Sequence, residues 1–467
     1  MSDRYDLAII GSGPAGYVGA IRAAQLGGRI AIIEGRDWGG TCLNRGCIPS
    51  KALIHVCESI EFARDAKDWG VVYAAPSIDW DALRKTKSRV VKQLVSGVEL
   101  LLDANKVTRV PGRGKLLGDG KIEVTAADGS QSILEAADIL IATGSVPWCP
   151  PFPGYDLPGL LNSDEAVDLP GPYESLAIVG GGAIGCEFAY VYAMLGAKVT
   201  IVEMMGQIVP TEDADAADVL AKALRKLGVK ILLNSKVSSV QDLGDRKRVE
   251  YEADGQAQAV EAQQILLAVG RKSDIDNLGL EEAGVERARP GIVADAHLKT
   301  SADHIYAAGD CLRGVGLAHL ASHEAIAAVE TILGEGGHVN YDCVPAAVFT
   351  HPEVSSVGLK EKQAAERGIA ITVGMFPMSA NSRAIATRQR EGFVKLIAAA
   401  DTGQLLGACI VGPQASELIA ACACAVEMGV TASEVADTIH SHPTFSEAIH
   451  EAALSVLGRP LHLPPKK

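Results

Sequence analysis

Hydrophobic and polar positions follow the same order in two separate stretches of the chain. Each stretch has a short apolar run, a glycine-rich turn, a helical segment and a second apolar run that leads to a glutamate. The first predicts a strand over 5–10, a helix to about residue 26 and a strand over 29–33. The second predicts a strand over 176–179, a helix to about residue 195 and a strand ending at Glu203. A strand–turn–helix–strand unit that occurs twice indicates an α/β protein.

Other apolar segments indicate how the two units are joined. Residues 139–144 and 265–270 are predicted strands that end in glycine, and we expect them to cross into and out of the second unit. Prolines crowd the first crossing and indicate a stiff linker there. Further strands are predicted at 121–125, where apolar and polar residues alternate, and at 305–310. After Tyr341 the pattern changes to mixed α+β.

This pattern divides the chain into three domains. We expect a first nucleotide-binding domain in residues 1–146, a second in 147–270, and a central segment in 271–341 that returns to complete the first. Residues 342–467 form the predicted C-terminal α+β domain. The fold class is therefore α/β with two Rossmann-like domains, and the length of 467 residues suits three domains of about 150 residues each.

Composition and charge disfavour several kinds of partner. A net charge of −14 makes nucleic acid an unfavourable ligand. No uncharged apolar run approaches the roughly 20 residues that span a bilayer, so we expect no membrane segment. The N-terminus begins with a core strand rather than a signal peptide, and the ten cysteines are scattered as in a reducing compartment. We therefore expect a cytoplasmic protein.

The two glycine-rich turns have the spacing of dinucleotide-binding loops. Their glycines permit a tight turn and the close approach of a pyrophosphate, which lies against the partial positive charge of a helix N-terminus. In both units a glutamate follows 23 positions after the first glycine, where it can accept hydrogen bonds from a ribose. The candidate residues are Gly11, Gly13, Gly16 and Glu34 in the first unit and Gly180, Gly182, Gly185 and Glu203 in the second.

Two cysteines, Cys42 and Cys47, directly follow the first nucleotide-binding unit. A thiol pair beside a dinucleotide site indicates that electrons move between a dithiol and a bound cofactor. The alternative is two buried cysteines that are close by chance, and a structural disulfide across so short a loop would stabilise the fold little. Cys422 and Cys424 lack a companion Cys/His pair, so we expect no metal site.

The segment GGTCLNRGCIPSKAL resembles the redox-active disulfide of the pyridine nucleotide–disulfide oxidoreductases, and its PSKAL ending is most similar to the dihydrolipoamide dehydrogenases of that family. The resemblance implies FAD, NAD and a Cys42–Cys47 redox disulfide. It assigns Cys47 as the charge-transfer thiol that faces the flavin and Cys42 as the interchange thiol. It also places Lys51 near the reactive edge of the flavin, paired with Glu187; the alternative is that both are ordinary exposed helical residues.

The motif TSADHIYAAGD resembles the second FAD signature of the family, in which an aspartate at the position of Asp310 meets the ribityl chain. Taken alone, the Gly-Asp pair could be an ordinary turn, although it follows a predicted strand, where α/β proteins bind ligands. The resemblance also assigns Thr41, Lys51, Thr143, Gly144, Ala318 and His319 to the FAD site and Gly270 to the NAD site.

Near the C-terminus, HSHPTFSEAIHEAAL resembles the HAHPTLSEA signature of the family. The resemblance assigns His442 as the base for a substrate thiol, Glu447 as its partner and His440 as a supporting residue. An imidazole suits proton transfer near neutral pH, and a carboxylate can orient it. Thr444 and Glu447 also have capping-box spacing, so the alternative is that Glu447 only caps a helix that begins near Pro443.

The resemblance implies that the chain reoxidises dihydrolipoamide to lipoamide through the disulfide and FAD, with NAD⁺ as the hydride acceptor. The implied partners are a second copy of the chain and either the lipoyl-bearing acyltransferase subunit of a 2-oxo acid dehydrogenase complex or the lipoyl protein of glycine cleavage. Cys42 and His442 belong to different domains, and the family's two-fold dimer lets the histidine of each subunit serve the disulfide of the other.

Other members of the family fit the sequence less well. Glutathione reductases usually carry Lys-Lys in place of Ser50-Lys51, and they prefer NADPH. In this chain no arginine follows Glu203 to bind the 2′-phosphate of NADPH, so the sequence favours NAD. Mercuric reductases add a C-terminal cysteine pair, and soluble transhydrogenases lack the redox cysteines. A catalytically silent nucleotide-binding subunit is a further alternative, which the retained cysteines, Lys51 and the His–Glu pair argue against.

Overall fold

The first sheet is built from apolar runs that are buried on both faces. The computed structural model describes residues 4–289, 291–312 and 316–464. Its parallel strands lie in the order β3 (Thr108–Pro111), β2 (Ile30–Glu34), β1 (Tyr5–Ile10), β6 (Gln131–Ile141) and β18 (Ile305–Ala307). Leu7 and Ile32 are completely buried, because helices cover parallel strands on both sides. β18 comes from the central segment and pairs with β6, so this sheet combines distant parts of the chain.

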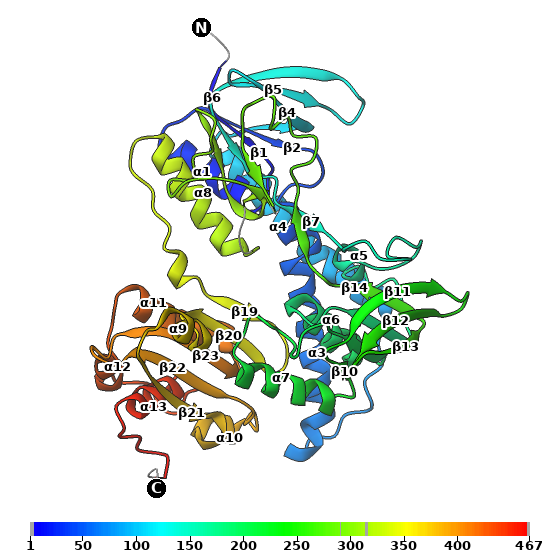
Figure 1. Ribbon diagram of the computed structural model, residues 1–467, viewed down its shortest axis with the longest axis vertical. Helices are drawn as coiled ribbons and strands as arrows, with labels where there is room; N and C mark the ends of the chain where they lie inside the picture. Colours follow the sequence, from blue (N-terminus) through cyan, green and yellow to red (C-terminus); the bar gives the residue numbers. More distant parts are fainter. Residues whose placement is uncertain (1–3, 290, 313–315, 465–467) are drawn as a thin grey trace.

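Two further elements complete this region, shown at the top of Figure 1. β4 (Arg113–Gly118) and β5 (Lys121–Thr125) form an antiparallel arm with the first half of β6. Helices α1 (Pro14–Gln25) and α8 (Ala318–Ile332) pack side by side, although they are far apart in sequence. A Cβ on Gly19 would lie 3.3 Å from the Cβ of Ala325, so small residues allow this close helix packing.

The second sheet repeats the parallel arrangement on a smaller scale. Its four strands lie in the order β10 (Lys230–Leu232), β9 (Lys198–Val202), β8 (Ser175–Val179) and β14 (Gln264–Leu267). Helices α6 (Ala183–Met194) and α7 (Ala214–Lys226) follow β8 and β9. An antiparallel sheet of β11 (Lys236–Asp242), β12 (Lys247–Ala253) and β13 (Gln256–Ala262) lies beside them.

The connections between the two sheets are short. β7 (Ser145–Pro147) and β15 (Arg271–Ser273) pair in antiparallel fashion where the chain enters and leaves the second sheet. The long helix α3 (Cys47–Asp65) contacts α6, and α4 (Trp80–Ala104) packs against α3. The remaining short elements here are α2 (Gly40–Arg45), η1 (Ala66–Trp69), α5 (Ser163–Ala166), β16 (Arg287–Ala288), β17 (Gly291–Ile292) and η2 (Gly309–Cys311).

The C-terminal region is a separate layer of one antiparallel sheet and several helices. The strand order is β19 (Ala346–Val348), β20 (Glu353–Gly358), β23 (Leu405–Gly412), β22 (Phe393–Ala399) and β21 (Ile371–Pro377). Helix α11 (Ala415–Glu427) packs on β20 and β23, and α13 (Glu447–Val456) on β21 and β22. The other helices are η3 (Tyr341–Cys343), α9 (Glu361–Arg367), η4 (Met378–Ala380), α10 (Ser382–Ala386) and α12 (Ala432–Asp437).

The observed architecture agrees with the predicted α/β fold of two Rossmann-like units and a C-terminal α+β domain (Figure 1). Several boundaries differ from the sequence prediction. β6 ends at Ile141, β14 at Leu267 and β18 at Ala307, so these strands are shorter than predicted and Thr143, Gly144 and Gly270 lie beyond them. Helix α13 begins at Glu447 rather than near Pro443. Among the residues that the structure describes, no helix is long and apolar enough to cross a membrane.

Candidate active site

The first glycine loop leaves one side open for a ligand. Gly11 has a φ of +104°, and a Cβ there would lie 2.3 Å from the carbonyl oxygen of Ala142. A Cβ on Gly16 would lie 1.8 Å from the carbonyl oxygen of Gly11, so only glycine lets α1 approach β1 this closely. A Cβ on Gly13, in contrast, would meet only the Cα of Gly40, at 4.0 Å. Gly13 therefore faces the space beside the N-terminus of α1, where a phosphate would be favoured.

The three glycines of the second loop have the same surroundings as those of the first loop. A Cβ on Gly180 would lie 2.4 Å from the carbonyl oxygen of Ala268, and one on Gly185 would lie 2.1 Å from that of Gly180. A Cβ on Gly182 would meet no atom within 4 Å. The middle glycine again borders open space at the start of a helix. Gly270 lies a few residues beyond the end of β14, the strand that borders this loop.

The two predicted ribose-binding glutamates are oriented by backbone amides of their own glycine loops. Ser12 donates its N–H (2.9 Å) and hydroxyl (2.6 Å) to Oε2 of Glu34. The N–H of Gly181 donates to Oε2 of Glu203, and the N–H of Met205 donates to Oε1 at 2.7 Å. Each carboxylate is therefore fixed beside its loop and retains acceptor capacity for a diol.

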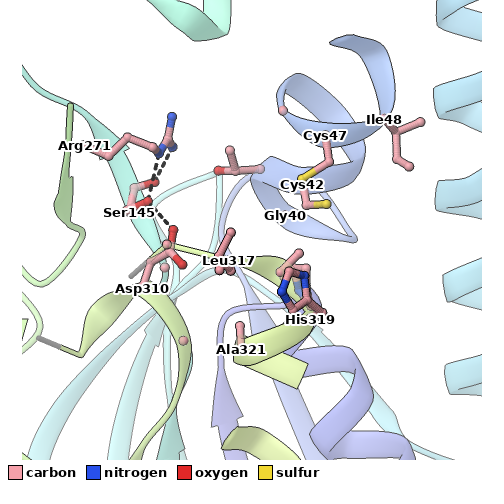
Figure 2. A pocket seen from close by; sticks show the side chains of 18 of the residues that line it. Gly40, Cys42, Cys47, Ile48, Ser145, Arg271, Asp310, Leu317, His319 and Ala321 are labelled. Atoms are coloured by element: carbon pink, nitrogen blue, oxygen red, sulfur yellow. Dashed lines mark hydrogen bonds between the residues drawn. The ribbon is translucent and has the colours of Figure 1, made fainter. Parts of the chain in front are cut away.

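A single large cavity of about 720 Å³ connects the first glycine loop with both cysteines. Its lining comes from all three regions of the fold and includes the predicted residues Gly11, Gly13, Glu34, Thr41, Cys42, Cys47, Lys51, Thr143, Gly144, Glu187, Asp310, Ala318 and His319. Figure 2 shows Cys42 and Cys47 on one side of this space, with His319 and Asp310 across from them. Sequence positions separated by hundreds of residues thus border one cavity.

The wall around Asp310 contains a chain of hydrogen bonds that links the two sheets. The Ser145 hydroxyl donates to Oδ2 of Asp310 at 2.6 Å, and Nε of Arg271 donates to Oγ of Ser145 at 2.9 Å (Figure 2). Ser273 donates its hydroxyl to the carbonyl oxygen of Asp310 at 2.7 Å. Ser145, Arg271 and Ser273 all belong to the β7–β15 connection, so the crossing between domains positions Asp310.

The two cysteines form an asymmetric pair of thiols at a helix start. Cys42 lies on α2, and Cys47 is the first residue of α3. A hydrogen bond from Cys42 lowers the pKa of Cys47 to about 7; burial acts against this shift, and the Lys51 ammonium supports it. The pKa of Cys42 is raised by the same hydrogen bond and by burial. A thiolate therefore forms first on Cys47, aided by the positive end of α3.

Lys51 joins the three regions at the cavity wall. Its Nζ lies 2.9 and 3.0 Å from the two carboxylate oxygens of Glu187 on α6, the partner that the family resemblance implied. The same Nζ lies 4.3 Å from the centroid of the Phe349 ring, and the N–H of Phe349 donates to Oε1 of Glu187 at 3.0 Å. The side chain of Glu187 is 9% exposed, and this pairing offsets the cost of burying its charge.

His442 and Glu447 form a pair in the C-terminal region. Nδ1 of His442 lies 2.8 Å from Oε1 of Glu447, and the N–H of Thr444 donates to Oε2 at 2.8 Å. One carboxylate oxygen therefore meets His442 and the other meets the Thr444 amide. The capping-box alternative is wrong in its N-cap, because α13 begins at Glu447 with Ser446 as the N-cap and no side-chain cap bond among the described residues. Burial opposes ionisation of Glu447, but the Thr444 amide and His442 together hold its pKa below the usual range. Nearby, Nδ1 of His440 faces the carbonyl oxygen of Thr438 at 3.0 Å.

The structure does not bring every predicted residue to the same place. The lining of the large cavity does not include His442 and Glu447, and the His442 side chain is 70% exposed. Nor does it include the predicted NAD residues Gly180, Gly182, Gly185, Glu203 and Gly270. Helix α6 connects the two sites, because it begins at the second glycine loop while Ile184 and Glu187 on it border the cavity.

Sequence reasoning missed four residues that shape the site. Ser145 and Arg271 follow the predicted glycine-ended strands, Phe349 lies in FTHPEVSSVG, and Ser12 lies within the first glycine turn. Their positions next to recognised motifs could have indicated a role in the site. The sequence did not reveal that role, because the contacts that they make involve distant segments.

The residues around the cavity fit a flavin dinucleotide. The hydroxyl oxygen of Thr143 is buried without a hydrogen-bond partner among the described residues, although it borders the cavity. Such an atom needs a partner from a ligand or water. Together with the open side of Gly13, the anchored Glu34 and the position of Asp310, it provides polar contacts along an otherwise largely apolar cavity. The second loop offers a comparable phosphate-binding turn for another dinucleotide.

Comparison with known proteins gives matches along most of the chain. The model of the pyridine nucleotide-disulphide oxidoreductases matches residues 5–325, and that of their dimerisation domain matches residues 344–453. The chain is 40% identical over 457 residues to dihydrolipoyl dehydrogenase from Geobacillus stearothermophilus, covering 97% of both proteins.

Two solved structures have the same fold over nearly their whole length. LpdA from Mycobacterium tuberculosis has a TM-score of 0.89 and 33% identity, covering 96% of this chain and 98% of that one. The Cu(II) complex of the HOCl-induced flavoprotein disulfide reductase RclA from Escherichia coli has a TM-score of 0.85 and 31% identity, covering 97% and 99%.

Proposed function

Because the chain belongs to the pyridine nucleotide-disulphide oxidoreductase family, we propose that it oxidises dihydrolipoamide to lipoamide with NAD⁺ as the hydride acceptor. Family members of this kind are flavoprotein disulfide reductases that use FAD and NAD or NADP, and the chain is 40% identical to a dihydrolipoyl dehydrogenase. The observation that carries the proposal is the Cys42–Cys47 pair in a cavity that also holds Lys51, Glu187 and the first glycine loop.

In the proposed reaction Cys42 and Cys47 begin as a disulfide. His442 accepts a proton from one thiol of dihydrolipoamide, and the resulting substrate thiolate attacks the sulfur of Cys42, which breaks the disulfide and releases Cys47 as a thiolate. The second substrate thiol attacks the substrate sulfur of the mixed disulfide and its proton passes to the departing Cys42 sulfur, which releases lipoamide and leaves Cys42 as a thiol. Two electrons then reside on the cysteine pair. The low pKa of Cys47 suits it to carry the thiolate.

Residues around the two cysteines prepare them to pass on the electrons taken from the substrate. Lys51, positioned by Glu187, stabilises the Cys47 thiolate and provides a fixed positive charge at the cavity wall. Gly13, Glu34, Thr143 and Asp310 would hold FAD, which supplies the two-electron chemistry between the dithiol and the pyridine nucleotide when bound. The second glycine loop and Glu203 would hold NAD⁺, and α6 links this loop to the cavity.

We further propose that each active site uses the His442–Glu447 pair of a partner subunit. The match to a dimerisation domain supports a homodimer, and this matched region contains His442. The exposure of His442 and its absence from the cavity lining support a role towards another molecule. A symmetric two-fold interface would supply one histidine to each disulfide.

Refolding two inactive variants together tests the shared site. A mixed dimer of Cys42→Ser and His442→Ala subunits holds both defects in one site and none in the other. Random pairing makes half of the dimers mixed, so activity should recover to about a quarter of wild type. If verified mixed dimers remain inactive, each subunit uses its own histidine and the shared site is wrong.

The nucleotide, partner and location follow from the same proposal. Glu203 beside the second loop favours NAD⁺ over NADP⁺, because a carboxylate repels a 2′-phosphate. The natural substrate would be the lipoyl group on an acyltransferase subunit of a 2-oxo acid dehydrogenase complex or on the lipoyl protein of glycine cleavage. We propose action in the cytoplasm, which the absence of disulfides among the described cysteines other than Cys42 and Cys47 supports.

A substrate panel tests the central proposal. Purified enzyme is assayed with dihydrolipoamide and NAD⁺, and in parallel with glutathione disulfide and NADPH. We expect turnover only with the first pair, and Cys42→Ser should abolish it while retaining FAD. Faster turnover with the second pair would assign the chain to another disulfide substrate, and no turnover together with an unreduced flavin would identify a catalytically silent protein.

A further inference from the structure

The loop that follows Glu203 contacts the second glycine turn at Gly181. We define residues 204–213, between β9 and α7, as the nucleotide loop. At its start Met205 donates its N–H to Glu203, and in its middle Val209 donates its N–H to the carbonyl oxygen of Gly181 at 2.7 Å. The position of Gly181, and with it the open turn, therefore depends on the conformation of this loop.

Val209 shows that the loop is held in an unfavourable conformation. Its φ is +39°, which is a rare value for a β-branched residue, and its side chain is buried. Such strain persists only where the surroundings determine the conformation. One restraint is the hydrogen bond to Gly181, and the other is the carbonyl oxygen of Val209, which accepts the N–H of Glu212 at 2.8 Å.

The far end of the nucleotide loop is anchored by two lysines of the C-terminal region. Nζ of Lys360 lies 2.9 Å from Oε1 of Glu212 and also donates to the carbonyl oxygen of Thr211. Nζ of Lys395, on β22, lies 2.8 Å from Oδ2 of Asp213. The side chains of Glu212 and Asp213 are only 6% and 10% exposed, so water competes little with these lysines.

Lys395 is the centre of this anchor. Its side chain is 1% exposed and also pairs with Asp215 at 2.9 Å and Glu361 at 2.6 Å. Burial alone would lower the pKa of Lys395, but the three carboxylates outweigh it and raise that pKa, so the ammonium remains charged. Removing this lysine would leave the largely buried carboxylate of Asp213 without its cation and beside the more exposed carboxylates of Asp215 and Glu361, which would repel it.

We propose that Lys395 and Lys360 are positioning residues for the pyridine nucleotide site, through which the C-terminal domain holds the nucleotide loop of the same chain. The path runs from Lys395 and Lys360 to Asp213 and Glu212, then through Val209 to Gly181. Neither lysine touches the nucleotide. This inference rests on the proposed role of the second glycine loop, and it does not depend on which dithiol the enzyme oxidises.

The test measures nucleotide binding directly. NAD⁺ and NADP⁺ are each titrated calorimetrically into the purified FAD-loaded wild type and its Lys395→Met and Lys360→Met variants, without any dithiol substrate. For the nucleotide that the wild type binds, we expect the dissociation constant to rise by about tenfold in Lys395→Met and by about threefold in Lys360→Met. Changes of this size are typical when a substitution acts on a binding site through a network of contacts. Flavin content and the rate of flavin reduction by the dithiol should remain at wild-type levels.

Lys226→Met is the matched control. Lys226 on α7 also forms an ion pair with the C-terminal region, at 2.8 Å from Glu391, but its side chain is 78% exposed. Exposed pairs contribute little, so its nucleotide affinity should stay within about twofold of wild type.

Melting temperatures separate positioning from a purely structural role. If Lys395→Met melts earlier but binds the nucleotide as tightly as wild type, the proposal is wrong. If Lys395→Met does not fold, Lys360→Met and Asp213→Asn decide the matter, and unchanged affinity in both overturns it. A wild type that binds neither nucleotide would instead refute the assigned function of the second glycine loop.

Discussion

Replacing Cys42 tests how strongly its thiol stabilises the Cys47 thiolate. The pKa of Cys47 falls from an ordinary 9.0 to about 7, mainly through the hydrogen bond from Cys42, with Lys51 as a further cause and burial in opposition. A fall of two pKa units corresponds to about 3 kcal/mol of preference for the thiolate. About half of Cys47 is therefore ionised at pH 7 in the reduced protein.

Two substitutions at Cys42 separate the hydrogen bond from the other causes. Cys42→Ser keeps a hydroxyl donor, so Cys47 should continue to titrate near 7. Cys42→Ala removes the donor, so the pKa of Cys47 should rise towards 9, because burial, which raises it, then opposes the remaining effect of Lys51. The thiolate fraction at pH 7 then falls from about one half towards about one hundredth.

The assay measures the rate at which iodoacetamide alkylates Cys47 at pH values from about 5 to about 10. Peptide mass spectrometry quantifies the alkylated cysteine. Only the thiolate reacts, so the rate rises with pH through the pKa. The exposed thiol of Cys424 serves as an internal reference. Adding Lys51→Met should raise the pKa of Cys47 in both variants. If the serine and alanine variants titrate at the same pH, the hydrogen bond is not the main cause and the reasoning fails.

Three other substitutions have specific expected outcomes. Glu203→Ala should narrow the preference for NAD⁺ over NADP⁺, measured as the ratio of kcat/KM; a wild type that prefers NADP⁺ would contradict this. Gly16→Ala should lose FAD, because the new Cβ would lie 1.8 Å from the carbonyl oxygen of Gly11; wild-type flavin content after gel filtration would refute the packing argument. Cys47→Ser should abolish turnover and lack the long-wavelength charge-transfer band that Cys42→Ser keeps, and the reverse spectra would exchange the roles of the two thiols.

The sequence alone was sufficient for features that depend on a few neighbouring residues. The glycine turns, the helices after them and the glutamates at the strand ends follow from backbone conformation and hydrophobic periodicity, which act locally. In the structure Gly11 and Gly16 make the close backbone contacts of a tight turn, and Glu34 accepts a hydrogen bond from Ser12. His442 and Glu447 are also close in sequence, so their spacing predicted the contact that the structure shows between them.

Local patterns were less informative about polar residues at junctions. The prediction of a helix near Pro443 placed its start too early, because the chain forms a bend at 442–443 and a turn at 445–446 before α13 begins at Glu447. Ser145 and Arg271 looked like ordinary polar residues after two strands. Their importance depends on the pairing of β7 with β15, which brings together segments that are 126 positions apart.

Composition and periodicity could not decide which distant charges meet. The family resemblance implied the pair of Lys51 and Glu187, which are 136 positions apart, whereas only the tertiary structure revealed the pair of Lys395 and Asp215, which are 180 apart. Nothing in composition or periodicity distinguishes these residues from solvated ones, because a lysine or a carboxylate on a helix or strand edge has the same local pattern in either case. The docking of one domain on another removes water from these groups, and this loss of water makes the choice of partner matter.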